Sequence, residues 1–97
     1  MVGQDANARR INAITEARRR SAEAAGHDDG ERAGFFTGYN FEQARHERPD
    51  TAPSTARLDV KKWADPRWRK DPAYRRAFAQ AAQRSFAEGR ETFLLSI

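Results

Sequence analysis

Large apolar side chains are scarce in this chain of 97 residues, and the scarcity limits the folds it can adopt. Six Phe, two Trp, two Tyr, three Leu and three Ile must supply most of the buried surface, because the eighteen alanines bury little area each. A chain of this length forms one domain with only a small surplus of buried surface. We therefore expect a single small domain, residues 1–97, whose thin core is either marginally stable alone or completed by a partner.

The N-terminal quarter of the chain has the features of a helix. Residues 4–25 contain neither Pro nor Gly, Asp5 can cap the start, and Gly26 is placed to end it. Ile11 and Ile14 supply a narrow apolar stripe, which is little to hold a helix of this length. We expect a first helix over residues 4–25.

A second segment, residues 30–47, is rich in aromatic side chains and fits two structures. The acidic residues and the glycine at its start are typical of a turn that caps a helix. The aromatic residues over 35–41 alternate as in a strand, and a hairpin through Thr37-Gly38 would follow from that pattern. The strongly helix-favouring residues after them, ended by Pro49, favour a helix instead. We predict a helix over residues 30–47.

Two glycines, Gly34 and Gly38, lie one turn apart on one face of this predicted helix. Without side chains they let another helix approach closely, and aromatic residues surround the gap. We expect this segment to lie at the centre of the fold, and an exposed aromatic groove for a partner peptide is the alternative.

The second half of the chain begins with a loop and continues with two copies of a helix-start signal. Residues 48–57 contain two prolines and several small polar residues, which predict the loop. Asp-Pro then occurs at 65–66 and again at 71–72, and Asp before a Pro at the first helical position is a specific start signal. We predict a one-turn helix over 66–70 and a long helix over 72–95.

The long C-terminal helix has the clearest periodicity in the chain. Apolar or small residues recur every three or four positions, at Tyr74, Phe78, Ala82, Phe86, Gly89 and Phe93. Together the segments predict an all-α fold: a small bundle of three main helices plus a short one-turn helix, with a long loop between the halves.

Residues that could carry out catalysis are few and scattered. His27 and His46 are the two histidines, and each lies beside acids without the spacing of a metal site. The chain has no Cys, and Gly34 and Gly38 lack the strand and the Lys of a phosphate-binding loop. We therefore expect a protein that is not an enzyme and uses no cofactor, no metal and no small-molecule substrate.

The stretch 57–76 combines basic and aromatic residues. Cations for phosphates beside flat rings for stacking are typical of surfaces that bind single-stranded nucleic acid or structured RNA. The alternative is that the rings anchor short elements on the core while the basic side chains cover them. The candidate partner-binding residues are Arg57, Lys61, Lys62, Trp63, Arg67, Trp68, Arg69, Lys70, Arg75 and Arg76.

The C-terminal residues are apolar on all sides of the predicted helix. Phe93, Leu94, Leu95 and Ile97 should be covered by the core or by a partner, because free apolar tails promote aggregation. With the thin core, this favours a small protein that docks a helical face on a larger protein or complex, as an adaptor, inhibitor or assembly subunit of the phage or bacterial accessory type. Self-association and nucleic-acid or ribonucleoprotein binding through residues 57–76 are the alternatives.

The N-terminal residues lack the basic-then-apolar order of a secretory signal, and no apolar run is long enough to span a bilayer. We expect a chain that does not associate with membranes. It would be cytoplasmic, or packaged in a particle assembled inside the cell.

Overall fold

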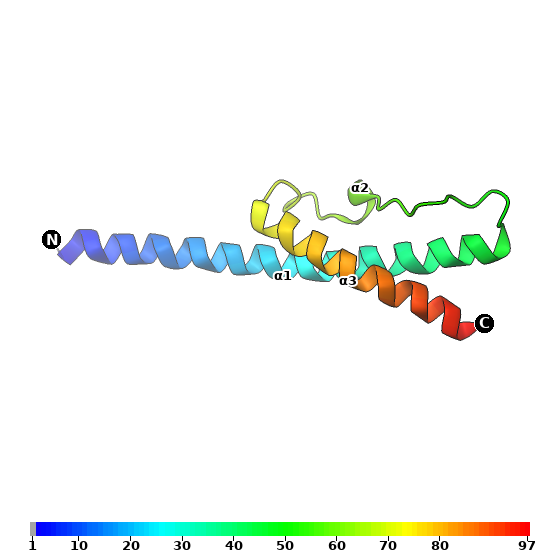
Figure 1. Ribbon diagram of the computed structural model, residues 1–97. Coiled ribbons are helices and arrows are strands. Elements are labelled where there is room, and N and C mark those ends of the chain that lie inside the picture. The colour runs from blue at the N-terminus through cyan, green and yellow to red at the C-terminus, as the bar shows by residue number, and fades with distance from the viewer. Residues whose placement is uncertain (1) are drawn as a thin grey trace.

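The computed structural model describes residues 2–97, with side chains described from Asp5 onward. It contains three helices, α1 (Val2–Glu47), α2 (Val60–Trp63) and α3 (Pro72–Ser96), and no strand within the described residues. α3 packs along α1, and the short α2 also contacts α1. Figure 1 shows α1 and α3 running in the same direction, so residues 48–71 carry the chain back along the pair. The all-α prediction is confirmed.

The predicted break between the first two helices is wrong, because residues 4–25 and 30–47 belong to one continuous helix, α1. Gly26 and Gly30 keep right-handed helical backbone and are buried, and no described residue adopts a positive φ. A glycine costs about 1 kcal/mol inside a helix relative to alanine. Here the close packing of α3 against these glycines offsets that cost. Local sequence signals do not indicate such packing, because α3 lies far away in the sequence.

A ridge of glycines sets how closely the two long helices approach. The glycine ridge, residues 26, 30, 34 and 38, repeats every four positions along α1. A Cβ placed on any of these glycines would overlap a backbone carbonyl oxygen of α3, and Gly89 faces the carbonyl of Phe35 in the same way. The predicted close approach at Gly34 and Gly38 is therefore confirmed. The facing pairs are Gly26 with Tyr74, Gly30 with Phe78, Gly34 with Ala82, and Gly38 with Phe86.

Residues 30–47 are helical throughout, so the helix prediction is confirmed and the hairpin is wrong. The ring of Tyr39 stacks on that of Phe35, with centroids 6.5 Å apart, and meets Phe93 of α3 edge-on at 5.4 Å. The Thr37 hydroxyl donates to the Ala33 carbonyl one turn back at 2.6 Å, as helical threonines do. The aromatic residues therefore serve contacts between helices rather than strand pairing.

The crossover, residues 48–71, contains the predicted loop and a short helix in an unexpected place. Residues 48–59 are not helical, which agrees with the predicted loop over 48–57. The one-turn helix lies at α2, where the Asp59 side chain caps the Lys62 N–H, and not at 66–70. Residues 66–70 form turns instead, closed by hydrogen bonds from the Trp68 N–H to the Asp65 carbonyl and from the Asp71 N–H to the Trp68 carbonyl, and Asp71 is extended before its proline.

α3 begins and ends close to the predicted bounds of 72–95. The Asp71 carboxylate accepts hydrogen bonds from the N–H groups of Ala73 at 2.9 Å and Tyr74 at 3.2 Å, as the Asp-Pro signal predicts. Most of the predicted apolar face is buried, while Phe86 is only partly covered and Ser85 beside it is buried. The Ser85 hydroxyl donates to the Ala81 carbonyl at 2.9 Å, so its burial leaves no unpaired polar atom.

Two buried polar residues tie the elements together. Tyr74 is 1% exposed; its hydroxyl donates to Asp29 Oδ2 of α1 at 2.7 Å and accepts the Asp65 N–H of the crossover at 2.8 Å. Burial, and then the neighbouring Asp29, raise the pKa of Tyr74 to about 12. Further along, the buried Glu42 carboxylate accepts Arg90 Nε–H of α3 at 2.7 Å. These contacts fix α3 and the crossover against α1 at two separate points.

Candidate binding surfaces

The stretch 57–76, here called the crossover surface, exposes every one of its eight basic side chains. Arg67 pairs with Asp65 at 3.0 Å, and this guanidinium lowers the pKa of the Asp65 carboxyl. The other seven have no ion-pair partner among the described residues. They leave a surplus of exposed positive charge on this stretch, at Arg57, Lys61, Lys62, Arg69, Lys70, Arg75 and Arg76.

The aromatic residues of the crossover surface are placed differently from its cations. Tyr74 is buried, and Trp63 and Trp68 are partly buried against the core. The Trp63 ring lies parallel to that of Phe36 of α1, with centroids 5.7 Å apart, and Lys62 Nζ lies 5.2 Å from the Trp63 centroid. The rings therefore attach the crossover to α1 and α3, and they offer less free area for base stacking than the sequence pattern implies.

A pocket opens between α2, the turn after it and α3. This cationic pocket has a volume of about 470 Å³. Most of the residues lining it are apolar. Three of the cations without an ion-pair partner also line it, and none of its lining residues is acidic. The lining residues are Leu58, Val60, Ala64, Arg69, Lys70, Tyr74, Arg75, Phe78 and Ala79. The sequence identified the cations but not the pocket, because the lining comes from separate segments that only the fold brings together.

A larger cleft of about 540 Å³ lies between α1, α3 and the loop before α2. Phe41 and Phe86 line it, and its one charged side chain, Arg90, lies over both rings and donates to Glu42. This cleft is therefore apolar, and its cation is already paired.

The predicted apolar tail divides into a buried part and an exposed part. Phe93 is buried against Tyr39 and His46, with ring centroids 5.4 Å from each. Leu94 is 45% exposed, Leu95 78% and Ile97 73%. One side chain of the predicted set thus belongs to the core, while the other three remain uncovered at the end of α3.

The N-terminal part of α1 lies outside the helix pair. Figure 1 shows α1 extending well past the start of α3, and no residue from 5 to 21, here called the arm, is buried. Ile11 and Ile14 are 63% and 62% exposed. The sequence predicted a bundle helix here; the one signal against it was that two isoleucines supply little apolar surface for a core.

Charges on the arm are segregated around its circumference. Glu16 accepts hydrogen bonds from Arg19 and Arg20, and Arg19 also contacts Glu23; the hydrogen bond from Arg19 is the main cause of the lowered pKa of Glu16. No acid lies three or four positions from either isoleucine, so none is next to them on their side of the helix. This isoleucine face consists of Arg10, Ile11, Ile14 and Arg18, and neither arginine has an ion-pair partner among the described residues.

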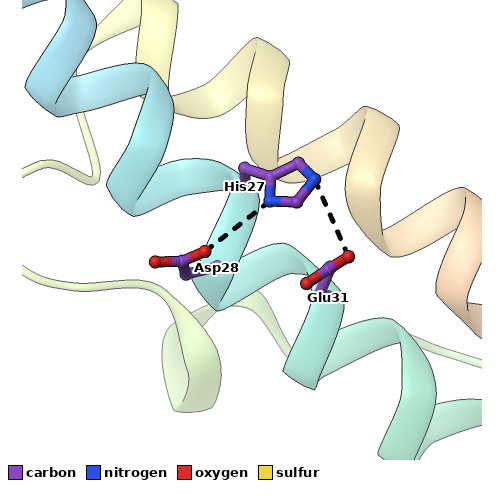
Figure 2. Close-up of side chains that lie close together, drawn as sticks. All are labelled: His27, Asp28 and Glu31. Carbon is purple, nitrogen blue, oxygen red and sulfur yellow. Dashed lines mark ion pairs between the residues drawn. The ribbon is translucent and has the colours of Figure 1, made fainter.

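A small polar cluster lies near the middle of α1. His27 Nδ1 lies 3.6 Å from Asp28 Oδ1, and His27 Nε2 lies 3.7 Å from Glu31 Oε1. Figure 2 marks both pairs with dashed lines. The three groups could present ligand atoms to one cation. All are well exposed, at 47%, 70% and 57% of their side chains, and all come from one helix. The four-residue spacing of His27 and Glu31 was a signal in the sequence that went unnoticed. Within the described residues, no other element contributes a ligand atom to the cluster.

No protein-family model, curated protein or solved structure matches this chain. None of the described helices combines the length and the apolar character needed to cross a bilayer. The geometry itself defines a pair of long helices joined by a crossover, with exposed apolar side chains toward both ends and exposed basic side chains between them.

Proposed function

We propose that this chain is a small binding protein, without catalytic activity, that docks the isoleucine face of its arm on a larger protein. The observation that carries the proposal is the exposure of Ile11 and Ile14 on a helical segment in which no residue from 5 to 21 is buried. Covering an isoleucine completely contributes roughly 1.5–3 kcal/mol. Arg10 and Arg18 flank the pair, so the partner best suited to this face has an apolar groove with carboxylates on its rim.

The exposed end of α3 supports an adaptor or assembly subunit rather than a simple inhibitor. Leu95 and Ile97 lie at the end of α3, and Figure 1 places this end opposite the N-terminus of α1. The molecule is 70 Å long in its largest dimension. Two apolar surfaces toward opposite ends of such an elongated molecule suit a protein that joins two partners, or two copies of one partner.

The arm is tested by replacing both isoleucines with glutamine, which keeps helix propensity and removes the apolar face. The matched control replaces Asn12 and Ala13 with glutamine, at two uncharged positions of the arm outside the isoleucine face. Affinity capture from the native host, after nuclease treatment, should recover one protein in stoichiometric amount with the wild type and the control but not with Ile11→Gln/Ile14→Gln. Equal recovery with the variant and the control would refute docking through this face.

Light scattering on the purified chain checks the competing possibility of self-association. A monomer agrees with a larger partner protein. A dimer that Ile11→Gln/Ile14→Gln dissociates would mean that the face binds a second copy, and the proposal of a larger partner would be wrong.

Nucleic-acid or ribonucleoprotein binding through residues 57–76 is the second candidate, because seven exposed cations there have no partner among the described residues. Such binding depends on counterion release, so its affinity should fall steeply between two salt concentrations in anisotropy titrations. Charge reversal at Lys61, Lys62 and Arg69 should weaken it without unfolding the chain. Failure to bind DNA or RNA at low salt would exclude this function.

A further inference from the structure

We propose that the cationic pocket is a second docking site, one that binds an acidic peptide segment of a partner through a bulky apolar side chain set between carboxylates. Three features of the pocket carry this inference: its volume, the chemistry of its walls and the charges on its rim. The site lies on the crossover and α3, away from the arm, so it does not depend on docking through the isoleucine face.

The walls of the pocket favour an apolar occupant. Val60, Ala64 and Phe78 have no hydrogen-bonding side-chain group, and the Tyr74 hydroxyl is already used by Asp29 and the Asp65 N–H. A volume of about 470 Å³ accommodates one or two large side chains. The three cations of the pocket can only donate hydrogen bonds, so the N–H donors of a nucleobase would lie unpaired against apolar walls, which costs affinity. A phenylalanine or leucine side chain brings none.

The cations on the rim of the pocket favour an occupant with negatively charged residues beside its apolar side chain. Arg69, Lys70 and Arg75 are exposed, and no described acid pairs with any of them. Further unpaired cations at Arg57, Lys61 and Lys62 extend the charge beyond the pocket. An extended acidic segment can therefore satisfy the rim and the neighbouring surface together, which a small anion cannot do.

The probe for this site is a fluorescein-labelled peptide in which two Phe are flanked on each side by Glu residues. Its binding to the protein is measured by fluorescence anisotropy at low salt. A second peptide of equal charge has Ser in place of both Phe. A short single-stranded oligothymidine reports nucleic-acid binding under the same conditions. We expect saturable binding of the Phe peptide and at least about tenfold weaker binding of the Ser peptide, because only the Phe peptide fills the pocket.

Variants then locate the site. Arg69→Glu/Arg75→Glu should weaken binding of the Phe peptide at least about tenfold. The matched control, Arg76→Glu/Arg84→Glu, makes the same change in net charge at exposed cations that do not line the pocket, and should have a much smaller effect. Val60→Gln, which makes one wall polar, should also weaken binding and leaves the charge unchanged. Far-ultraviolet circular dichroism verifies that each variant folds.

Three results would overturn the proposal. The first is equal affinity for the Phe and Ser peptides, which would mean that charge alone attracts them. The second is an equal loss in the pocket variant and the charge-matched control. The third is tighter binding of the oligothymidine than of the Phe peptide, lost in the same pocket variant, which would assign the surface to nucleic acid. None of these results bears on the arm, whose test uses a different surface and a different readout.

Discussion

Tyr74 is the residue whose removal should report most directly on how the fold is held. Its hydroxyl joins all three parts of the molecule, since it donates to Asp29 of α1, accepts from the backbone of Asp65 in the crossover, and belongs to α3. Tyr74→Phe removes only the oxygen and keeps the ring that packs against Phe78. The substitution therefore separates the hydrogen bonds from the apolar packing.

The expected loss follows from the two bonds. A hydrogen bond to a carboxylate contributes roughly 1.5–3 kcal/mol, and a donor left unpaired in a buried position costs roughly 1–3 kcal/mol. Because Asp29 keeps its contact with Arg32, we expect a total loss of about 2–4 kcal/mol of unfolding free energy. A domain of this size has only about 5–15 kcal/mol in all. Its melting temperature should fall by roughly 10–25 °C.

Urea denaturation followed by circular dichroism measures this loss, and its pH dependence provides a second readout. Folding raises the pKa of Tyr74 from its ordinary value of 10.0 to about 12. A raised pKa means that the stabilisation by the protonated hydroxyl is complete below pH 10 and is lost as the pH rises toward 12. The size of this shift corresponds to roughly 3 kcal/mol. Tyr74→Phe should lack this part of the alkaline destabilisation.

Tyr39→Phe is the matched control, because the Tyr39 ring is also packed between the helices but its hydroxyl makes no hydrogen bond within the described residues. We expect it to change the unfolding free energy by less than about 0.5 kcal/mol. The reasoning would be refuted if Tyr74→Phe and Tyr39→Phe were equally mild, or if the wild type and Tyr74→Phe lost the same stability between pH 10 and 12.

Two further predictions concern the contact between the long helices. Gly30→Ala should lower the unfolding free energy by about 2 kcal/mol, because the added Cβ would overlap the backbone of Phe78. This loss should outweigh the better helix propensity of alanine. Unchanged or higher stability in urea denaturation would contradict the close approach of the two helices. Arg90→Met should lower the unfolding free energy by about 2 kcal/mol, because the buried Glu42 then lacks its partner on α3. Adding Glu42→Gln should restore part of that stability. A double-mutant cycle that shows no coupling between the two substitutions would contradict the pairing.

The sequence predicted the elements whose signals are local. The Asp-Pro pair at 71–72 and the regular apolar spacing after it gave α3 to within one residue of its observed bounds. The helix over 30–47 was also correct, because its C-terminal residues have high helix propensity. These features depend on neighbours a few positions apart, which is the range over which a sequence pattern is informative.

The features that were missed depend on contacts between distant segments. Gly26 and Gly30 have the composition of a helix end, and only the approach of α3 explains why the helix continues through them. Their four-residue spacing with Gly34 and Gly38 is a signal in the sequence for one continuous close contact along α1. The cationic pocket gave no such signal, since its walls come from α2, the following turn and α3.

The parallel arrangement of the long helices has a consequence for how the chain folds. Gly26 meets Tyr74 and Gly30 meets Phe78, so in each of these pairs the partner lies 48 positions later in the chain. Helical proteins with short connections form their contacts early, whereas here the long connection must close before the glycines are covered. Four glycines weaken that part of α1 until α3 arrives. We therefore expect helix formation over residues 26–38 and docking of α3 to occur in one cooperative step, slower than in an up-and-down bundle of similar size.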